Sequence, residues 1–325
     1  MPRLESGGGE DRRLQTEEEV SVRIRTALAI AMVAGIVAMN PALAQDLGPR
    51  VTRLAEGVYV HKGNGFDSNS GIIITSEGAV VIDTGQTAID AHSIMATVKK
   101  LTNLPVRMVI DTEPHGDHAL GHFLFSPPAV VIAAAGAGES MRTMVPPVPE
   151  RIQKAAGSSP AMKAALEGFR MVTPHIEYKD RTTLNIGGRT IELIHLKGVH
   201  SEADTAVWLP KERVLFSASA FVANQINIFR PFVNIADILA AGKLMKALNP
   251  EHVVPGHGAP GTAKLFDDGE RYYALLLDRV RPLVQAGKTL AEIQKEVKMP
   301  EYASWASQDR MPTNIDAAWR AVTGK

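Results

Sequence analysis

The feature that most constrains this chain is an apolar strand that runs directly into a cluster of side chains able to bind metals. Residues 106–110 are rich in β-branched side chains, and Pro105 ends the helical pattern before them. Just beyond this strand stand two carboxylates and two imidazoles: Glu113, His115, Asp117 and His118. Because α/β folds place their chemistry on the loops that follow strands, the sequence predicts a functional site on this loop.

The type of site is narrowed by the complete absence of cysteine from the 325-residue chain. Thiol nucleophiles, thiolate zinc fingers, iron–sulfur clusters and disulfides are therefore excluded. Imidazole and carboxylate are the ligands that zinc takes when thiolate is missing. Alternate residues of a loop can point the same way, so Glu113, His115 and Asp117 can converge while His118 turns aside. We interpret the cluster as ligands of two adjacent ions, and a solvated polar loop is the alternative.

Two distant histidines strengthen the metal interpretation. His200 ends an apolar strand in the sequence Gly-Val-His, and His257 lies between two glycines after another strand. Glycines on both sides let the backbone come close to a metal and turn the imidazole toward it. Isolated histidines at strand ends are mostly structural, but here three separate strand ends each carry one. The sequence therefore predicts a site assembled from several loops.

Strands and helices are predicted over the rest of the chain. The predicted strands cover residues 51–60, 71–82, 106–110, 130–134, 181–195 (a hairpin), 205–209, 214–216 and 252–254. The predicted helices cover residues 89–101, 150–169, 237–248, 265–285 and 290–297. This order favours a sandwich of two sheets with helices on both outer faces.

The N-terminal segment predicts export from the cytoplasm. Residues 1–22 are polar, two arginines precede an apolar run at residues 27–39, and an Ala-x-Ala pattern ends at Ala44. These features are typical of a secretory signal peptide, and the apolar run is short for a membrane anchor. We expect residues 1–44 to be a disordered extension and signal peptide, cleaved near Ala44 to leave a periplasmic or secreted protein. Residues 45–325 are expected to form a single domain with C-terminal helices and no membrane span.

The charge balance argues against a nucleic-acid partner. The 35 basic and 35 acidic side chains give a formal net charge of zero. No basic stripe interleaved with aromatic residues stands out in the sequence. A small-molecule substrate fits this composition better, and the sequence leaves the oligomeric state open.

Together these motifs resemble the metallo-β-lactamase superfamily. Its signature is His-x-His-x-Asp-His after a strand, a later Gly-His-Thr, an Asp after a Leu-Phe strand and a final Gly-His. The resemblance extends from about residue 51 to residue 261 and includes an Asp-Thr-Gly turn at residues 83–85. It implies an α/β fold, a four-layer αββα sandwich. It also implies two zinc ions, one held by Glu113, His115 and His200 and the other by Asp117, His118 and His257.

The chain departs from the family signature at three positions. Glu113 stands in place of the first His, Ser201 in place of the Thr, and Ser219 where most members carry an Asp that bridges the metals. The last change resembles the β-lactamase subclass that lacks a cysteine ligand, and variants of that subclass carry Gln or Glu at the first position. The formal ligand charge is unchanged, but the resemblance implies that it moves from between the metals onto one of them. We therefore expect one tightly bound zinc and a second, weaker one.

The resemblance also implies hydrolysis by a metal-activated water. Zinc lowers the pKa of a bound water to about 7, and that water attacks an electrophilic carbon. Asp117 is expected either to orient the water and shuttle its proton or to act purely as a ligand. The expected substrate is a β-lactam or a similar cyclic amide or ester. Lactones, sulfate esters and hydrolytic aryl dehalogenation are alternatives, as is a non-enzymatic role as a periplasmic accessory protein.

Several other polar residues are expected near this site. Asp83 and Ser219 are predicted to support the metal ligands by hydrogen bonds rather than to react. Four side chains on the loop after Ser219 are predicted to bind a substrate carboxylate: Asn224, Gln225, Asn227 and Arg230. Capping of the loop backbone is the alternative role for these four. His122, just after the motif, is interpreted as structural.

Overall fold

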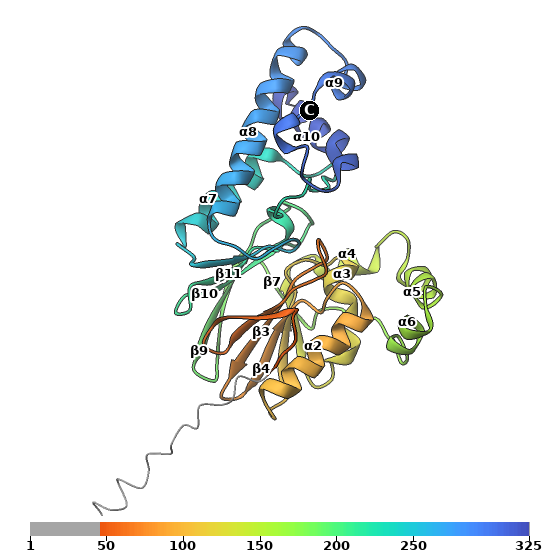
Figure 1. Ribbon diagram of the computed structural model, residues 1–325, viewed down its shortest axis with the longest axis vertical. Helices are drawn as coiled ribbons and strands as arrows, with labels where there is room; N and C mark the ends of the chain where they lie inside the picture. Colours follow the sequence, from red (N-terminus) through yellow and green to blue (C-terminus); the bar gives the residue numbers. More distant parts are fainter. Residues whose placement is uncertain (1–45, 325) are drawn as a thin grey trace, which may run out of the picture. The chain divides into compact units, whose positions relative to one another are not determined.

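The computed structural model describes residues 46–324 (Figure 1). The predicted N-terminal extension and signal peptide lie outside these residues. From Leu47 onward the chain forms one compact unit. Among the described residues, no helix is both long enough and apolar enough to cross a membrane.

One sheet within residues 46–324 contains seven strands, which follow one another in sequence order. They are β1 (Val51–Ala55), β2 (Val58–His61), β3 (Ser70–Thr75), β4 (Gly78–Ile82), β5 (Val106–Ile110), β6 (Val130–Ala134) and β7 (Ile176–Tyr178). β1 to β4 pair antiparallel, and β4 to β7 pair parallel. Parallel neighbours need a crossover, and α2 (Ala88–Leu101) provides it between β4 and β5.

The other sheet, in the same part of the chain, contains five strands in the order β12-β11-β10-β9-β8. They are β8 (Arg181–Ile186), β9 (Arg189–His195), β10 (Thr205–Leu209), β11 (Val214–Phe216) and β12 (His252–Val254). β8 to β11 pair antiparallel, and β12 adds to β11 in parallel. The hairpin predicted at residues 181–195 is therefore confirmed.

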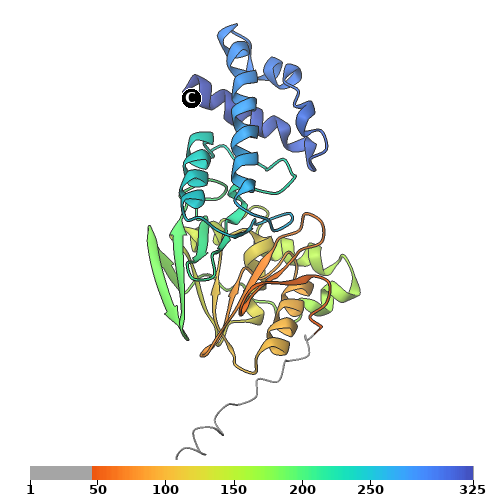
Figure 2. The same cartoon turned by 60° about the vertical axis from the view of Figure 1, so that its left-hand side comes forward.

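The two sheets pack face to face, with helices on both outer faces (Figures 1 and 2). Ile73 of the first sheet and Val207 of the second share the core between the sheets. Because successive strand residues point to opposite faces, their neighbours Ile72 and Trp208 face outward. Ile72 packs with Ile94 of α2, and Trp208 packs with the C-terminal helices. The chain is therefore an α/β protein, and the expected four-layer αββα sandwich is confirmed.

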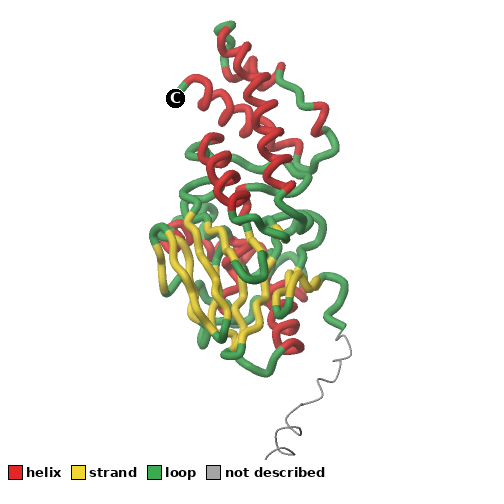
Figure 3. The backbone as a smooth tube through the Cα atoms, turned by 90° about the vertical axis from the view of Figure 1, so that its left-hand side faces the viewer, coloured by secondary structure: helices red, strands yellow, loops and turns green. Residues whose placement is uncertain are grey.

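The remaining helices lie in the connections and at the C-terminal end, where Figure 3 places a group of helices beyond the strands. They are α3 (Gly116–Ala119), α4 (Ala137–Arg142), α5 (Val148–Ala156), α6 (Pro160–Ala165), α7 (Ile235–Ala247), α8 (Lys264–Gln285), α9 (Leu290–Glu296) and α10 (Met311–Thr323). Local sequence explains where several helices begin. Thr289 forms a capping box with Glu292 at the start of α9, and Thr87 caps α2.

Three predicted elements are divided in the structure. The predicted strands 51–60 and 71–82 are each a hairpin, because Glu56 and Gly57 (φ 67°) reverse the chain in the first and Ser76 and Glu77 in the second. The predicted helix 150–169 is two helices, α5 and α6, and Ser159 caps the second by accepting a hydrogen bond from a backbone N–H. β7, α3, α4 and α10 are absent from the prediction.

The loops that carry the predicted ligands follow strands of both sheets. The motif loop follows β5 and leads into α3. His200 follows β9, Ser219 lies in a short turn after β11, and His257 follows β12. An isolated β-bridge joins Ser68, on the loop after β2, to His257. The site is therefore built where several strand ends meet, as the sequence indicates.

Candidate metal centre

Glu113 lies at the centre of the cluster and is only 1% exposed. Its two carboxylate oxygens face different partners. Oε2 lies 2.8 Å from His115 Nδ1 and 3.2 Å from His200 Nε2. Oε1 lies 2.7 Å from His118 Nε2 and accepts a hydrogen bond from Ser219 Oγ at 2.5 Å. One buried carboxylate therefore contacts both halves of the predicted site.

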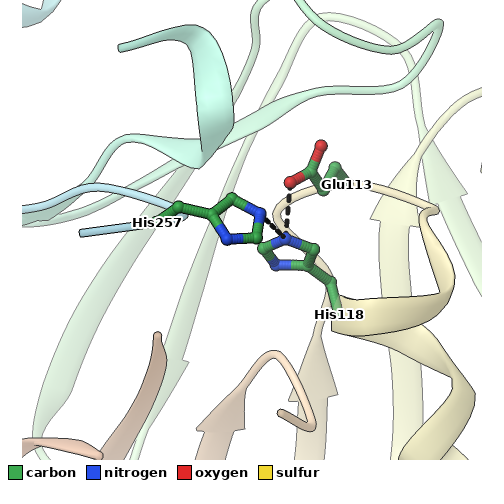
Figure 4. Close-up of side chains that lie close together, drawn as sticks. All are labelled: Glu113, His118 and His257. Atoms are coloured by element: carbon green, nitrogen blue, oxygen red, sulfur yellow. Dashed lines mark hydrogen bonds and ion pairs between the residues drawn. The ribbon is translucent and has the colours of Figure 1, made fainter. Parts of the chain in front are cut away.

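Within residues 46–324, two sets of three residues have the geometry to hold a metal ion, and Glu113 belongs to both. We name Glu113, His115 and His200 the first group, and Glu113, His118 and His257 the second group. Within each group the ligand atoms lie within 4.8 Å of one another. The two imidazoles of each group meet edge to face, with ring centroids 5.1 Å apart. Figure 4 shows the second group, with the carboxylate and both rings converging.

Hydrogen bonds on the far side of both imidazoles fix the second group. The Phe66 carbonyl oxygen lies 2.8 Å from His257 Nδ1, which must donate because a carbonyl only accepts. Asp83 Oδ2 lies 2.9 Å from His118 Nδ1 in the same way. With the proton on Nδ1, a neutral ring directs the lone pair of Nε2 into the group. The two Nε2 atoms are 3.3 Å apart, and a cation between them satisfies both, so these residues fit a metal ion.

Asp83 is the support that the sequence analysis expects behind the ligands. It lies in the turn after β4 and is 2% exposed. Its carboxylate accepts hydrogen bonds from the Thr112 N–H at 2.7 Å and from the Thr112 hydroxyl at 2.5 Å. Burial raises the pKa of Asp83, although His118 and Thr112 oppose that rise. This buried carboxyl group therefore holds the motif loop and the His118 ring at the same time.

The first group has fewer supports of this kind. His200 Nδ1 is buried and has no hydrogen-bond partner among the described residues. Arg230 Nη1 approaches His200 Nε2 at 3.5 Å and donates to the His200 carbonyl oxygen at 3.1 Å. Burial, with Arg230 and neighbouring histidines adding to it, lowers the pKa of His200 to about 3. The His200 ring is therefore neutral near pH 7.

Charges inside the cluster set its protonation before metal binds. Burial raises the pKa of Glu113, but His118, His200 and His115 outweigh it and hold that pKa well below its usual range. Burial lowers the pKa of His118, but Glu113 and Asp83 outweigh it and raise that pKa well above its usual range. Metal-free protein therefore holds Glu113 ionised and His118 protonated, and a metal ion must displace that proton.

Asp117 lies beside the second group and is more exposed than Glu113, the carboxylate within that group. Its Oδ2 lies 3.3 Å from His257 Nε2 and 3.8 Å from His118 Nε2, and its side chain is 31% exposed. Burial raises the pKa of Asp117, but His118 and His257 outweigh it and hold the pKa below the usual range. An ionised carboxylate at this position can bind a metal or accept a proton.

Asp204 shapes the loop that carries His200, and the sequence analysis missed it. Its carboxylate accepts hydrogen bonds from the His200 N–H at 2.6 Å and the Ser201 N–H at 2.9 Å. Burial, with the Glu113 carboxylate adding to it, raises the pKa of Asp204 to about 7. The available signal was an Asp shortly after the predicted ligand His200, because Asp often closes a tight loop by accepting backbone hydrogen bonds.

A cavity of about 380 Å³ opens beside both groups. Its walls include four residues of the cluster and three arginines: His115, Asp117, His200, His257, Arg151, Arg230 and Arg310. Three guanidinium groups around one cavity favour an anionic ligand. A second cavity, of about 430 Å³, shares Gln86, Gly116, Asp117 and Arg151 with the first. Its other walls include apolar side chains of α5 and α6 and the segments that lead into α2 and follow α3.

Comparison with known families identifies the chain. Residues 63–257 match the sequence model of the family described as Metallo-beta-lactamase superfamily, and this span covers more than half of the chain. The chain belongs to the metallo-β-lactamase superfamily. This membership places it among metal-dependent hydrolases, and the two groups give it residues able to hold metal.

Similar members of the superfamily differ in their activities. The metallo-β-lactamase type 2 of Bacteroides fragilis is 25% identical over 229 residues, which are 67% of this chain and 82% of that protein. The structure of the sec-alkylsulfatase Pisa1 from Pseudomonas sp. matches with a TM-score of 0.64 and 19% identity, over 83% of this chain and 49% of that one. The metallo-β-lactamase from Pontibacter korlensis matches with a TM-score of 0.52 and 23% identity, over 67% of this chain and 94% of that one. This chain therefore spans about half the length of the alkylsulfatase.

The orientation of Glu113 bears on one expectation about this superfamily site. With Ser219 in place of the bridging Asp, the ligand charge is expected to lie on one metal only. The Glu113 carboxylate faces both groups, one oxygen to each, because it enters between the two pairs of histidines. The Ser219 hydroxyl donates to Oε1 and holds this orientation. The expectation of one tight and one weaker zinc stays a prediction.

Three of the four loop residues predicted to bind substrate line the cavity: Gln225, Asn227 and Arg230. Asn227 also braces the turn below the site, because its Nδ2 donates to the Ser219 carbonyl oxygen at 2.6 Å. Asn224 instead lines a separate cavity, which does not include any residue of the two groups. A shared role in substrate binding is therefore kept for three of these residues and dropped for Asn224.

His122 lies close to the motif but belongs to neither group. Its Nε2 lies 2.7 Å from Asp111 Oδ1, and its Nδ1 lies 2.8 Å from the Val172 carbonyl oxygen. Both ring nitrogens are engaged, which agrees with the structural role interpreted from the sequence.

Proposed function

We propose that this chain is a zinc-dependent hydrolase that opens a β-lactam or a similar cyclic amide or ester. The observation that carries the proposal is the pair of groups that share Glu113 and open on one cavity. Imidazole and carboxylate are the donor set that zinc takes in proteins without thiolate ligands. The proposed ligands of one ion are Glu113, His115 and His200, and those of the other are Asp117, His118 and His257.

In this proposal the residues of the chain supply position, charge and a proton acceptor. Bound zinc lowers the pKa of a water to about 7 and polarises the bond to be broken. Asp117 is ionised and lines the cavity, so it can orient that water and accept its proton. Asp83 keeps His118 in one orientation throughout, because its hydrogen bond to Nδ1 lies away from the cavity side.

The arginines of the cavity support an anionic substrate. Arg230 is fixed against the His200 backbone, and Arg151 is fixed by hydrogen bonds to the Val145 and Pro146 carbonyl oxygens, both at 2.8 Å. Arg310 forms no ion pair with any residue in the described part of the chain. A guanidinium binds a carboxylate through two parallel hydrogen bonds, and most β-lactams carry a carboxylate next to the reactive ring.

A sulfate ester with an apolar tail is the second candidate. The alkylsulfatase likeness extends over 83% of this chain, whereas the Pontibacter korlensis β-lactamase likeness extends over 67%. A sulfate group is also an anion that the arginines can bind. The second cavity meets the first at Gln86, Gly116, Asp117 and Arg151, and its apolar side chains Ile152, Met162 and Leu166 could contact the tail.

A substrate panel tests the proposal. Purified protein is freed of metal with a chelator, reloaded with zinc, and assayed with nitrocefin, a carbapenem, a lactone, an aryl ester and a linear alkyl sulfate. We expect turnover of nitrocefin or the carbapenem only after reloading. Asp117→Asn should lower this turnover about 100-fold or more, because it removes a general base but keeps its shape.

Each outcome of the panel selects one function. Turnover of the alkyl sulfate without β-lactam turnover would favour the second candidate. Turnover of the lactone or aryl ester alone would keep the hydrolase and change its substrate class. Zinc-loaded protein that hydrolyses none of the five would contradict the proposed substrate classes and leave hydrolytic aryl dehalogenation and the accessory role as the remaining alternatives.

We also propose that the mature protein works outside the cytoplasm. The signal-peptide pattern that ends at Ala44 supports this, and export would bring a β-lactamase to its substrate. N-terminal sequencing of protein from the periplasm or medium should find Gln45 first. Expression of the full chain should then raise resistance to β-lactam antibiotics, whereas a chain without residues 1–44 should not.

A further inference from the structure

We propose that Glu113 bridges the two metal ions, with one carboxylate oxygen on each. This inference rests on the proposed function, since it assumes that both groups hold zinc. The inference goes beyond the proposed function, because it gives Glu113, at the first position of the motif, the role of bridging the metals. Most superfamily members give this role to the Asp at the position of Ser219. The ions are those of the first and second groups.

The first argument is the direction of the two oxygens. Oε2 lies 2.8 and 3.2 Å from the two imidazole nitrogens of the first group. Oε1 lies 2.7 Å from the Nε2 of His118 in the second group. These contacts are hydrogen bonds and ion pairs before metal binds, and they already direct each oxygen at the ligand atoms of a different group, so a large rotation of Glu113 is not needed for it to bind both ions. Two-metal hydrolases hold their ions about 3.5–4 Å apart, a distance that one carboxylate spans.

The second argument is what occupies position 219. The Ser219 hydroxyl donates to Oε1 of Glu113 at 2.5 Å, so the carboxylate and the hydroxyl share the space between the groups. Backbone packs closely on the other side, because a Cβ on Gly256 would lie 2.2 Å from Ser219 Oγ. A small residue at 219 therefore leaves room for the Glu113 carboxylate and orients it.

The third argument is electrostatic. The side chain of Glu113 is fully enclosed and faces imidazoles from both groups, and it makes no ion pair with an Arg or Lys within residues 46–324. A buried carboxylate is costly unless cations compensate it. Two zinc ions, one on each oxygen, supply that compensation, and the second ion takes the place beside Oε1 that the proton of His118 holds before metal binds.

The test measures zinc affinity with one group at a time. His200→Ala leaves the second group, and His257→Ala leaves the first. Glu113→Gln is then added to each background, and the dissociation constant of the remaining zinc is measured by competition with a chromophoric chelator. A bridging Glu113 predicts that affinity falls in both backgrounds, by about 100-fold or more, since loss of even an outer partner of a ligand costs 10- to 100-fold.

A matched control removes a carboxylate that lies elsewhere. Glu150→Gln, on an exposed site of α5, should leave zinc affinity unchanged in both backgrounds. If Glu113→Gln weakens zinc only in the His257→Ala background, Glu113 serves the first group alone and the inference is wrong. If the wild-type protein binds no zinc at all, the proposed function fails as well, so the two failures can be told apart.

A second measurement covers the case in which a single-group variant does not fold. Difference infrared spectra of wild-type protein with and without zinc report the carboxylate stretching bands that change on binding. A bridging carboxylate separates its two stretching frequencies less than a carboxylate bound through one oxygen. We expect the narrow splitting, lost in Glu113→Gln, and a wide splitting would overturn the inference.

Discussion

The two groups share one carboxylate but differ in how their imidazoles are held. In the second group, the far nitrogens of His118 and His257 lie 2.9 and 2.8 Å from fixed acceptors. In the first group, His200 Nδ1 has no partner among the described residues. Outer hydrogen bonds orient an imidazole and make it a better ligand. A shared ligand therefore does not make two equal sites, and we expect the second group to bind zinc more tightly.

The largest expected effect comes from removing one imidazole from each group. His118→Ala should abolish the tighter zinc and lower kcat/KM by at least about 100-fold, because it deletes a ligand together with its support. His200→Ala should abolish the weaker zinc and leave the tighter one in place. Zinc content after dialysis against a weak chelator, together with steady-state kinetics, measures both effects.

A histidine outside both groups provides the control for these variants. His252, on β12, is replaced as His252→Gln and should keep both the zinc content and kcat/KM. If His200→Ala, rather than His118→Ala, removes the tighter ion, the order of the two groups is reversed.

The next prediction tests the hydrogen bond by which Asp83 supports His118 from outside the second group. Asp83→Asn keeps the shape of the side chain but removes the charge that holds His118 Nδ1. We expect the zinc of the second group to bind about 10- to 100-fold more weakly and the zinc of the first group to weaken less, because the Asn oxygen can still accept the hydrogen bond from the Thr112 N–H that holds the motif loop. Chelator competition measures the two constants, with Asp278→Asn on the exposed face of α8 as the control. Equal weakening at both groups would mean that Asp83 supports the whole motif loop.

The same contrast explains how much of the site could be predicted from the sequence. The motif residues, His200 and His257 all follow strands, and their loops meet as expected because strand ends of the sandwich gather at one place. Asp83 was found as well, since it follows a buried strand in the same way. Side chains that chemistry requires at strand ends are visible in the sequence.

The partners that make the groups unequal could not be predicted. His257 is held by the carbonyl oxygen of Phe66, and every residue has a carbonyl, so the sequence carries no signal for it. Arg151 and Arg310 reach the cavity only because α5 and the segment before α10 pack there. The direction of each Glu113 oxygen depends on which loops lie on either side of it, and this too comes from packing.

The fold, like the site, could be predicted from the sequence only in part. Apolar periodicity located most strands and helices, but it merged β1 with β2 and β3 with β4. The turns between them are only two residues long, Glu56-Gly57 and Ser76-Glu77, and so short an interruption is easily read as part of one strand.

A smaller effect follows from protonation and separates the groups by pH. The raised pKa of His118 means that a proton competes with zinc for the second group, whereas the His200 pKa of about 3 means that His200 is already free of its proton. As pH falls from 7 to 6, zinc affinity of the second group should fall about tenfold, and that of the first group should fall less. Titration of the His200→Ala and His257→Ala variants at both pH values measures this. Steeper loss in the first group would contradict the assignment.

The smallest effect tests whether Ser219 acts on Glu113 or on a metal. Ser219→Ala removes the hydroxyl that donates to Oε1 but keeps the carboxylate and its charge. The hydrogen bond is lost from the metal-free and the zinc-bound protein alike. Zinc affinity therefore changes only by the difference in the strength of this hydrogen bond between the two states. We expect less than about a tenfold change, confined to the second group, which Oε1 faces. Chelator competition measures it, and Ser217→Ala, in the neighbouring buried turn, is the control. A loss of 100-fold or more would mean that Ser219 itself binds an ion, and the second group would then owe its tighter binding to an extra ligand rather than to its outer hydrogen bonds.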